Sequence, residues 1–373
     1  LSRGKPWKHV GVLGIVTSTI ILGFYSVVAG WCMQYLYASF VGDILGDSDY
    51  VKNYFVSFSS GVFRPIVWGQ GFILLTHFVI VRGIRDGIER FSKMMMPTLF
   101  VLLLILVVAS CMLPGAIKGV EFLLYPDFSK VDGHVVLAAL GQAFFSLSLG
   151  TACLCTYASY FSRNTNLVRS SVQIAFIDTG VAILAGLMLF PAAFSVGINP
   201  DSGPSLIFIT LPNVFQQAFA SMPTIGYVTS IIFYALLSLA ALTSTISMHE
   251  IGTAFFHEEL KKPRRTAAWV ITVIASIICI VSSLSVGAYT ELQVFGMSMM
   301  DCFDKLTAQI LLPVGGFLTC IYIGWFASRQ IVYEEFTNES TVNKNLFRVF
   351  IFAVRYVCPV FILLIFLDQL GLL

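Results

Sequence analysis

Long apolar stretches separated by short polar segments make up most of this 373-residue chain. A helix that crosses the hydrocarbon core of a bilayer needs about 20 mainly apolar residues. Nine stretches are long enough, and because lipid offers the backbone no hydrogen-bonding partner, each is predicted to be a helix. The predicted spans lie near residues 10–38, 65–81, 94–113, 134–161, 169–198, 225–250, 267–286, 306–327 and 347–369.

The composition supports an all-α polytopic membrane protein. Hydrophobic residues make up 57% of the chain and charged residues 11%, and the mean hydropathy is +0.86, which excludes an ordinary soluble domain. The net charge of +2 predicts no nucleic-acid partner. The chain also has no catalytic pattern: His249-Glu250 is followed by Thr253 where a zinc-binding HExxH motif needs its second histidine. We therefore expect no enzyme activity.

Charged residues predict the orientation in the membrane. Loops that would share one side carry sixteen lysines and arginines, and the opposite loops carry only Lys52, Arg64, Lys118 and Lys130. Cytoplasmic loops hold the positive excess. We therefore expect a multi-pass protein of the cell (inner or plasma) membrane, with Leu1 on the cytoplasmic side and the C-terminus outside.

The fourth span contains residues that weaken a helix at the depth of the bilayer centre. Ser146 to Thr151 reads SLSLGT, so four of six residues are serine, glycine or threonine. The pair Ser146 and Gly150 has the spacing that lets two helices pack closely. The same cluster is also typical of a discontinuous transport helix. The residues alone leave both interpretations open.

Three oxygen-bearing residues share one face of the 225–250 span. Ala240, Thr243 and Ser244 are spaced i, i+3 and i+4, so one carbonyl and two hydroxyls converge. Such oxygens suit a hard cation such as sodium. The alternative is that both hydroxyls simply bond back to their own helix.

Two further polar residues lie inside spans. A carboxylate in an apolar helix usually has a partner or a function, and Asp178 is one. The alternative is an N-terminal helix cap, although Asp178 lies nine residues after Arg169. Tyr25 places a hydroxyl deep in the first span, where bonding to a neighbouring helix is the simplest role.

The chain contains the blocks GQAFFSLSLG followed by TYASY, ITLPNVF, AALTSTIS, GIERFSKMMMP, FPAAF and RYVCPVF. These blocks resemble the neurotransmitter:sodium symporter family, which includes the bacterial leucine transporter. The resemblance implies a leucine-transporter-type inverted-repeat helical bundle. The nine spans match the family's third to eleventh, and its first two spans have no counterpart in these residues.

The resemblance also implies roles for individual residues. It makes Phe145 and Asp304 gate residues, and the arginine partner of Asp304 would belong to the family's first span. The implied substrate-binding residues are Ile21, Tyr25, Phe145, Ser148, Thr151, Ser244 and Met248, and the implied sodium ligands, in two sites, are Ser146, Asp178, Ala240, Thr243 and Ser244.

These matches predict a sodium-coupled symporter for a neutral, hydrophobic or aromatic L-amino acid that works by alternating access. Chloride is not expected as a cofactor, because Asp178 would supply a fixed negative charge beside the sodium ions. The alternatives are a sodium-coupled transporter of another amine or an osmolyte, and a non-transporting receptor or decayed paralogue. The sequence gives no indication of the oligomeric state.

Overall fold

The computed structural model describes residues 6–161, 165–196, 206–220, 222–294, 296–337 and 344–372. Three of the basic loop residues, Arg3, Lys5 and Arg163, and the end of the predicted span 169–198 lie outside these ranges. The described residues form no β-strand, only an isolated bridge between Val294 and Met297. The predicted all-α fold class is therefore confirmed.

Sixteen α-helices follow one another in the described residues. In the first half of the chain they are α1 Lys8–Val41, α2 Ser48–Ser59, α3 Phe63–Val81, α4 Arg90–Cys111, α5 Ile117–Leu124, α6 Gly133–Ser146, α7 Cys153–Ala158 and α8 Leu167–Ser195. In the second half they are α9 Leu211–Ala218, α10 Pro223–Ala254, α11 Arg264–Ser285, α12 Met299–Lys305, α13 Leu312–Ile321, α14 Arg329–Thr337, α15 Lys344–Phe352 and α16 Cys358–Gln369.

Eight helical segments of the described residues are long and apolar enough to cross a membrane. Two of them join several helices through π-helical turns: Met299–Phe326 contains α12 and α13, and Asn345–Gln369 contains α15 and α16. The remaining predicted span, 134–161, is divided into the short helices α6 and α7. The eight segments are Lys8–Val41, Phe63–Val81, Gly87–Cys111, Leu167–Ser195, Pro223–Glu259, Arg264–Ser285, Met299–Phe326 and Asn345–Gln369.

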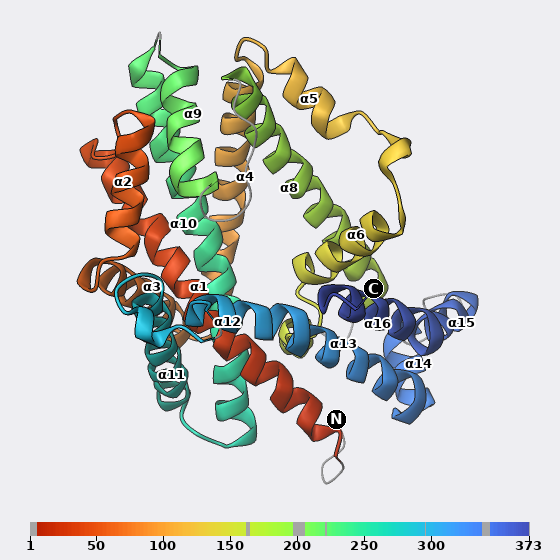
Figure 1. The fold of residues 1–373 in the computed structure, drawn as a ribbon. Helices are drawn as coiled ribbons and strands as arrows, with labels where there is room; N and C mark the ends of the chain where they lie inside the picture. The colour runs from red at the N-terminus through yellow and green to blue at the C-terminus, as the bar shows by residue number, and fades with distance from the viewer. Residues whose placement is uncertain are drawn as a thin grey trace.

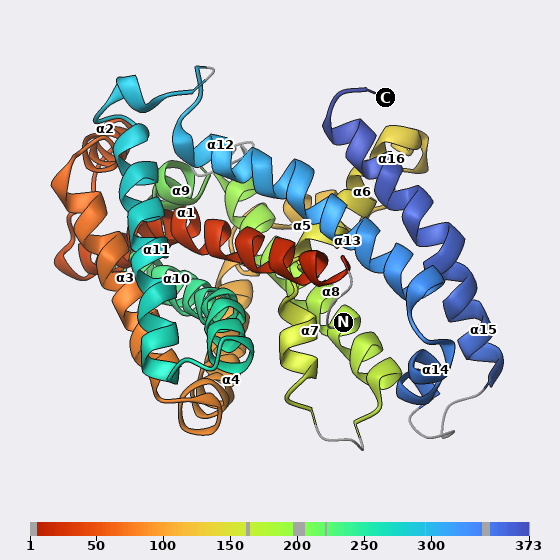
Figure 2. The ribbon, with the colours of Figure 1, turned by 90° about the horizontal axis from the view of Figure 1, so that it is seen from below.

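Helix α1 lies at the centre of the bundle. It packs along α10 and also contacts α3, α11 and α13 (Figures 1 and 2). The crossing with α3 is very close, because a Cβ atom on Gly30 would lie 2.5 Å from the backbone nitrogen of Gly69. Only glycine permits this approach, and it fixes α3 against the central helix.

An aromatic core holds one end of the bundle together. Trp31 and Tyr35 of α1 are fully buried and meet Phe208, whose ring also stacks on Phe55 of α2. Tyr234 of α10 contacts Tyr35 and donates a hydrogen bond to the carbonyl of Ile207. Aromatic pairs of this kind add to the stabilisation from apolar burial. The core therefore fixes the register of α1 against α10, which positions the polar residues farther along both helices.

A second group of helices lies beside this central set. Helix α8 packs against α4 and α5, and α16 packs against α13 and α6. Figure 1 shows α6 close to α16, while Figure 2 shows α7 on the other side of the break, near the N-terminal half of α1. The interrupted segment thus lies between the central helices and the second group.

Candidate functional site

The break between α6 and α7 spans residues 147–152. Its backbone turns through three residues with positive φ, which are Ser148 at 52°, Gly150 at 89° and Ala152 at 62°. The described residues direct no hydrogen bond to the carbonyl oxygens of Leu147 and Leu149, which are therefore available to a ligand. Of the two sequence interpretations, the discontinuous helix is confirmed.

The break also packs tightly against α13. A Cβ atom on Gly150 would clash with the carbonyl oxygen of Leu312, and one on Gly315 would lie 2.9 Å from the carbonyl oxygen of Gly150. Gly150 is required twice over, since its φ is also one that other residues rarely adopt. The unwound backbone is therefore held in one place by its neighbour.

Ser146 and Asp178 come together at the end of α6. The Ser146 hydroxyl lies 2.9 Å from each carboxylate oxygen of Asp178, to which it donates. Asp178 lies eleven residues into α8, whose N-terminus is capped by the side chain of Asn166. The alternative that Asp178 is a helix cap is therefore wrong. A hydroxyl and a carboxylate from two helices form one oxygen cluster beside the break.

A second oxygen cluster lies on α10. The Thr243 hydroxyl donates to the carbonyl of Ala240 at 2.7 Å, and the Ser244 hydroxyl donates to the same carbonyl at 3.3 Å. The predicted convergence of three oxygens is confirmed, and so is the back-bonding that the alternative describes. Each hydroxyl uses its proton in this contact and keeps oxygen lone pairs for another group. The cluster is half-buried.

Helix α1 connects the second cluster to the break. Ser18, Ile21 and Tyr25 lie on one face of α1. Tyr25 lies near Ser244, and the buried Ser18 hydroxyl donates to the carbonyl of Thr151 at 2.7 Å. Sequence reasoning missed Ser18, although its position one turn before Ile21 is a usable signal.

The other predicted substrate residues differ in burial and in their partners. Thr151 is buried and donates to the carbonyl of Ser148 at 2.8 Å. Phe145, at the end of α6, is 53% exposed, and Met248 lies one turn after Ser244, packed against the core. The structure thus places Ser148 and Thr151 on the break, Phe145 just before it in α6, and Met248 on the helix of the second cluster.

Asp304 has no hydrogen bond to this group among the described residues. It is an exposed residue of α12, and its backbone carbonyl accepts a hydrogen bond from Thr307 at 3.1 Å. Among the described residues, no hydrogen bond joins its carboxylate to another predicted site residue. Its gate role stays a prediction.

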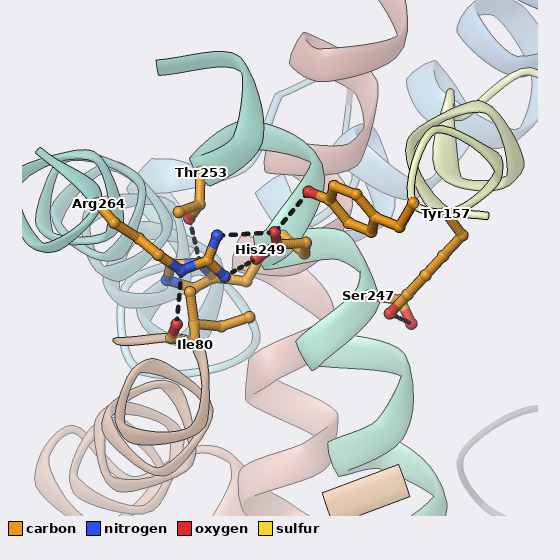
Figure 3. A network of polar contacts seen from close by, with 8 residues as sticks. Ile80, Tyr157, Ser247, His249, Thr253 and Arg264 are labelled. Carbon is orange, nitrogen blue, oxygen red and sulfur yellow. Dashed lines mark hydrogen bonds and ion pairs between the residues drawn. The ribbon is translucent and has the colours of Figure 1, made fainter. Parts of the chain in front are cut away.

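Sequence reasoning also missed a polar network on the C-terminal side of the second cluster along α10 (Figure 3). Glu250 of α10 is fully buried and forms a bidentate ion pair with Arg264 at the start of α11, at 3.0 and 2.5 Å. Tyr160 donates to Glu250 at 2.7 Å, and Tyr157 contacts Ser247 at 2.8 Å. The sequence carries a signal for this network, because Tyr157 and Tyr160 are three residues apart, and their partners Ser247 and Glu250 have the same spacing.

A buried histidine pair adjoins this network. Both imidazoles share the Thr272 hydroxyl, at 2.7 Å from Nδ1 of His77 and 2.9 Å from Nε2 of His249. The other nitrogen of His249 contacts Thr253 at 3.0 Å. His249, which belongs to the incomplete HExxH pattern, therefore helps to join the three helices α3, α10 and α11 through side-chain hydrogen bonds.

Comparison with known proteins yields matches over nearly the whole chain. Residues 48–371 match the model of the sodium:neurotransmitter symporter family. The uncharacterized sodium-dependent transporter YhdH of Bacillus subtilis is 35% identical over 99% of this chain and 81% of its own length. An uncharacterized sodium-dependent transporter of Haemophilus influenzae is 32% identical over 98% of the chain and 80% of its own length.

Two further matches are informative. The sodium- and chloride-dependent taurine transporter of Bos taurus is 26% identical over 87% of this chain and 59% of its own length. Among solved structures, that of MhsT in complex with L-phenylalanine superposes with a TM-score of 0.86. It is 35% identical, and the match covers 99% of this chain and 82% of MhsT.

Proposed function

Because the chain belongs to the sodium:neurotransmitter symporter family, we propose that it carries a neutral, hydrophobic or aromatic L-amino acid across the membrane together with sodium. The protein is a multi-pass membrane transporter that uses sodium and is not an enzyme. The proposal concerns the amino-acid substrate, the two sodium sites and alternating access between the two sides of the membrane.

One observation supports the proposal above all others: two oxygen clusters flank a broken helix. Ser146 and Asp178 supply a hydroxyl and a carboxylate on one side of the break. Ala240, Thr243 and Ser244 supply a carbonyl and two hydroxyls. Hard cations prefer such oxygens, and unwound helices are where transporters place ion and substrate sites. Each cluster would provide part of one sodium site.

The residues around the break favour an apolar substrate with a carboxylate. Tyr25 offers one hydroxyl near Ser244, while Ile21, Phe145 and Met248 offer apolar surface. Methionine adapts to different side-chain shapes. The structural relative MhsT, which carries L-phenylalanine in its solved complex, supports an aromatic substrate.

Equilibrium binding tests the proposed substrate. We expect the full-length protein to bind labelled L-phenylalanine in sodium chloride and to lose this binding in potassium chloride. Unlabelled L-leucine or L-phenylalanine should displace the label, and taurine should not. Displacement by taurine but not by either amino acid would favour the alternative of an amine or osmolyte transporter, to which the taurine relative gives some support. Sodium-dependent binding without uptake would favour a receptor.

Changing Tyr25 to phenylalanine should weaken substrate binding about ten- to a hundredfold. The change removes one charge-assisted hydrogen bond to the substrate carboxylate, which contributes about 1.5–3 kcal/mol. Titration of labelled phenylalanine measures the effect. Tyr37→Phe is the matched control, because Tyr37 is on the same helix but is 51% exposed. Equal affinities for Tyr25→Phe and wild type would limit Tyr25 to its contact with Ser244.

Uptake should not require chloride. Two sodium ions in a site of low dielectric need nearby negative charge, which Asp178 supplies through its carboxylate. We expect equal uptake in sodium gluconate and sodium chloride, and we expect Asp178→Asn to make uptake depend on chloride. If the wild-type protein stops working when gluconate replaces chloride, Asp178 is not the compensating anion.

The basic loop residues support the proposed orientation in the plasma membrane. Arg264 pairs with Glu250, which accepts from Tyr160 just after α7, and Lys262 and Arg265 are its neighbours in the sequence. We place this end of the bundle in the cytoplasm. On this assignment the Tyr160, Glu250 and Arg264 network lies on the cytoplasmic side of the proposed sodium and substrate sites.

A further inference from the structure

Two tyrosines face α10: Tyr157 lies in the short helix α7, and Tyr160 lies two residues after its end. Tyr157 and Tyr160 are three residues apart, as are their partners Ser247 and Glu250, which share one face of α10. The contacts measure 2.8 Å for Tyr157 with Ser247 and 2.7 Å for Tyr160 with Glu250 (Figure 3). Two hydroxyl groups therefore hold the inner half of the broken helix against α10.

The direction of the hydrogen bond between Tyr157 and Ser247 follows from counting hydroxyl protons. The Ser247 hydroxyl lies 3.1 Å from the carbonyl oxygen of Thr243 and donates to it. A serine hydroxyl has one proton, so in its contact with Tyr157 it accepts. The chain of hydrogen bonds therefore runs from Tyr157 through Ser247 to the backbone of Thr243, whose own hydroxyl donates to Ala240 in the second oxygen cluster.

The contact of Tyr160 with Glu250 leads to groups outside the second oxygen cluster. Tyr160 donates to Glu250, and Glu250 forms an ion pair with Arg264. The Nε of Arg264 donates to the carbonyl of Ile80 at 3.1 Å. These groups belong to α10, α11 and α3. Tyr160 thus anchors α7 to the surrounding helices, whereas Tyr157 contacts the helical turn that carries the cluster's oxygens.

We infer that Tyr157 is a positioning residue that couples cation binding at Ala240, Thr243 and Ser244 to the docking of α7 on α10. A bound cation fixes the turn from Thr243 to Ser247, and in that geometry Ser247 can accept from Tyr157. Docking of α7 then strengthens cation binding by the same factor, because coupling between two binding events is reciprocal. This inference rests on the proposed sodium symport.

Removal of either hydroxyl should raise the sodium concentration for half-maximal uptake about fivefold, as expected for one hydrogen bond of ordinary strength. The variants are Tyr157→Phe and Ser247→Ala, and their combination should be no worse than either alone. Ser247→Thr keeps the hydroxyl and should restore the wild-type value. Ser159→Ala is the matched control, because among the described residues the Ser159 hydroxyl, just after α7, bonds only to the carbonyl of Thr156, at 2.6 Å.

A second readout separates coupling from general stability. Sodium should raise the melting temperature of the wild-type protein, because a ligand stabilises the state that binds it. This sodium-induced increase should shrink in Tyr157→Phe and remain unchanged in Ser159→Ala. A purely structural role would lower the melting temperature equally in sodium and potassium, and it would overturn the inference.

The proposed function and the role of Tyr157 can fail separately. A wild-type protein without sodium-dependent uptake would refute the proposed function itself. Normal wild-type uptake, with additive losses in the double variant or a sodium requirement within twofold of wild type in both single variants, would refute the role of Tyr157 alone.

Discussion

Sodium-driven uptake is expected to fall to background when Thr243 and Ser244 are both changed to alanine. The change removes two of the three oxygens that converge on α10. A half-buried site at bilayer depth has little water to replace them, and a poorly coordinated cation is costly to bury. Initial uptake rates of labelled amino acid against sodium concentration measure the effect.

The chain offers a control with the same chemistry. Thr98 and Ser171 also bond back to their own helices, at 2.9 Å each, and both are exposed. Thr98→Ala together with Ser171→Ala removes the same two groups away from the site. If both double variants transport with the wild-type sodium dependence, the hydroxyls of Thr243 and Ser244 only pack and bond within α10.

The second large effect concerns the stability of the fold. Arg264→Met should lower the free energy of unfolding by about 3–5 kcal/mol, because it leaves the fully buried Glu250 carboxylate without its cation. Denaturant unfolding in detergent measures the loss. Arg265→Met is the control, because Arg265 is the exposed neighbour on the same turn.

A double variant shows whether the loss comes from the unpaired charge. Glu250→Gln with Arg264→Met removes both charges and leaves the glutamine oxygen to accept from Tyr160, so it should recover more than half of the lost stability. Equal destabilisation by Arg264→Met and Arg265→Met would show that the buried pair does not contribute as described.

The sequence predicted those features that depend on local chemistry. The helices follow from apolar stretches of sufficient length. The serine, glycine and threonine between Ser146 and Thr151 were consistent with close packing or with a break, and the structure shows the break. Helical spacing was enough to bring Ala240, Thr243 and Ser244 together. In each case the information lies within a few residues of the feature.

Contacts between distant segments were less accessible. From the sequence, Asp178 could be a helix cap or a ligand. The structure shows that α8 begins eleven residues before Asp178 and that the Asp178 carboxylate faces Ser146. The pairing of Tyr160 with Glu250 joins residues ninety apart, and it requires α7 to take one register against α10. The three-residue spacing of Tyr157 and Tyr160 is visible in the sequence, but only packing of the whole bundle decides which residues they meet.

The central claim is that a sodium gradient drives uptake of a neutral amino acid, and transport by purified full-length protein in liposomes tests it most directly. Vesicles loaded with potassium and diluted into sodium should accumulate labelled L-phenylalanine above its outside concentration. A sodium ionophore such as monensin should abolish the accumulation. Equal accumulation after dilution into potassium, or accumulation that the ionophore leaves intact, would contradict sodium-coupled uptake of a neutral amino acid.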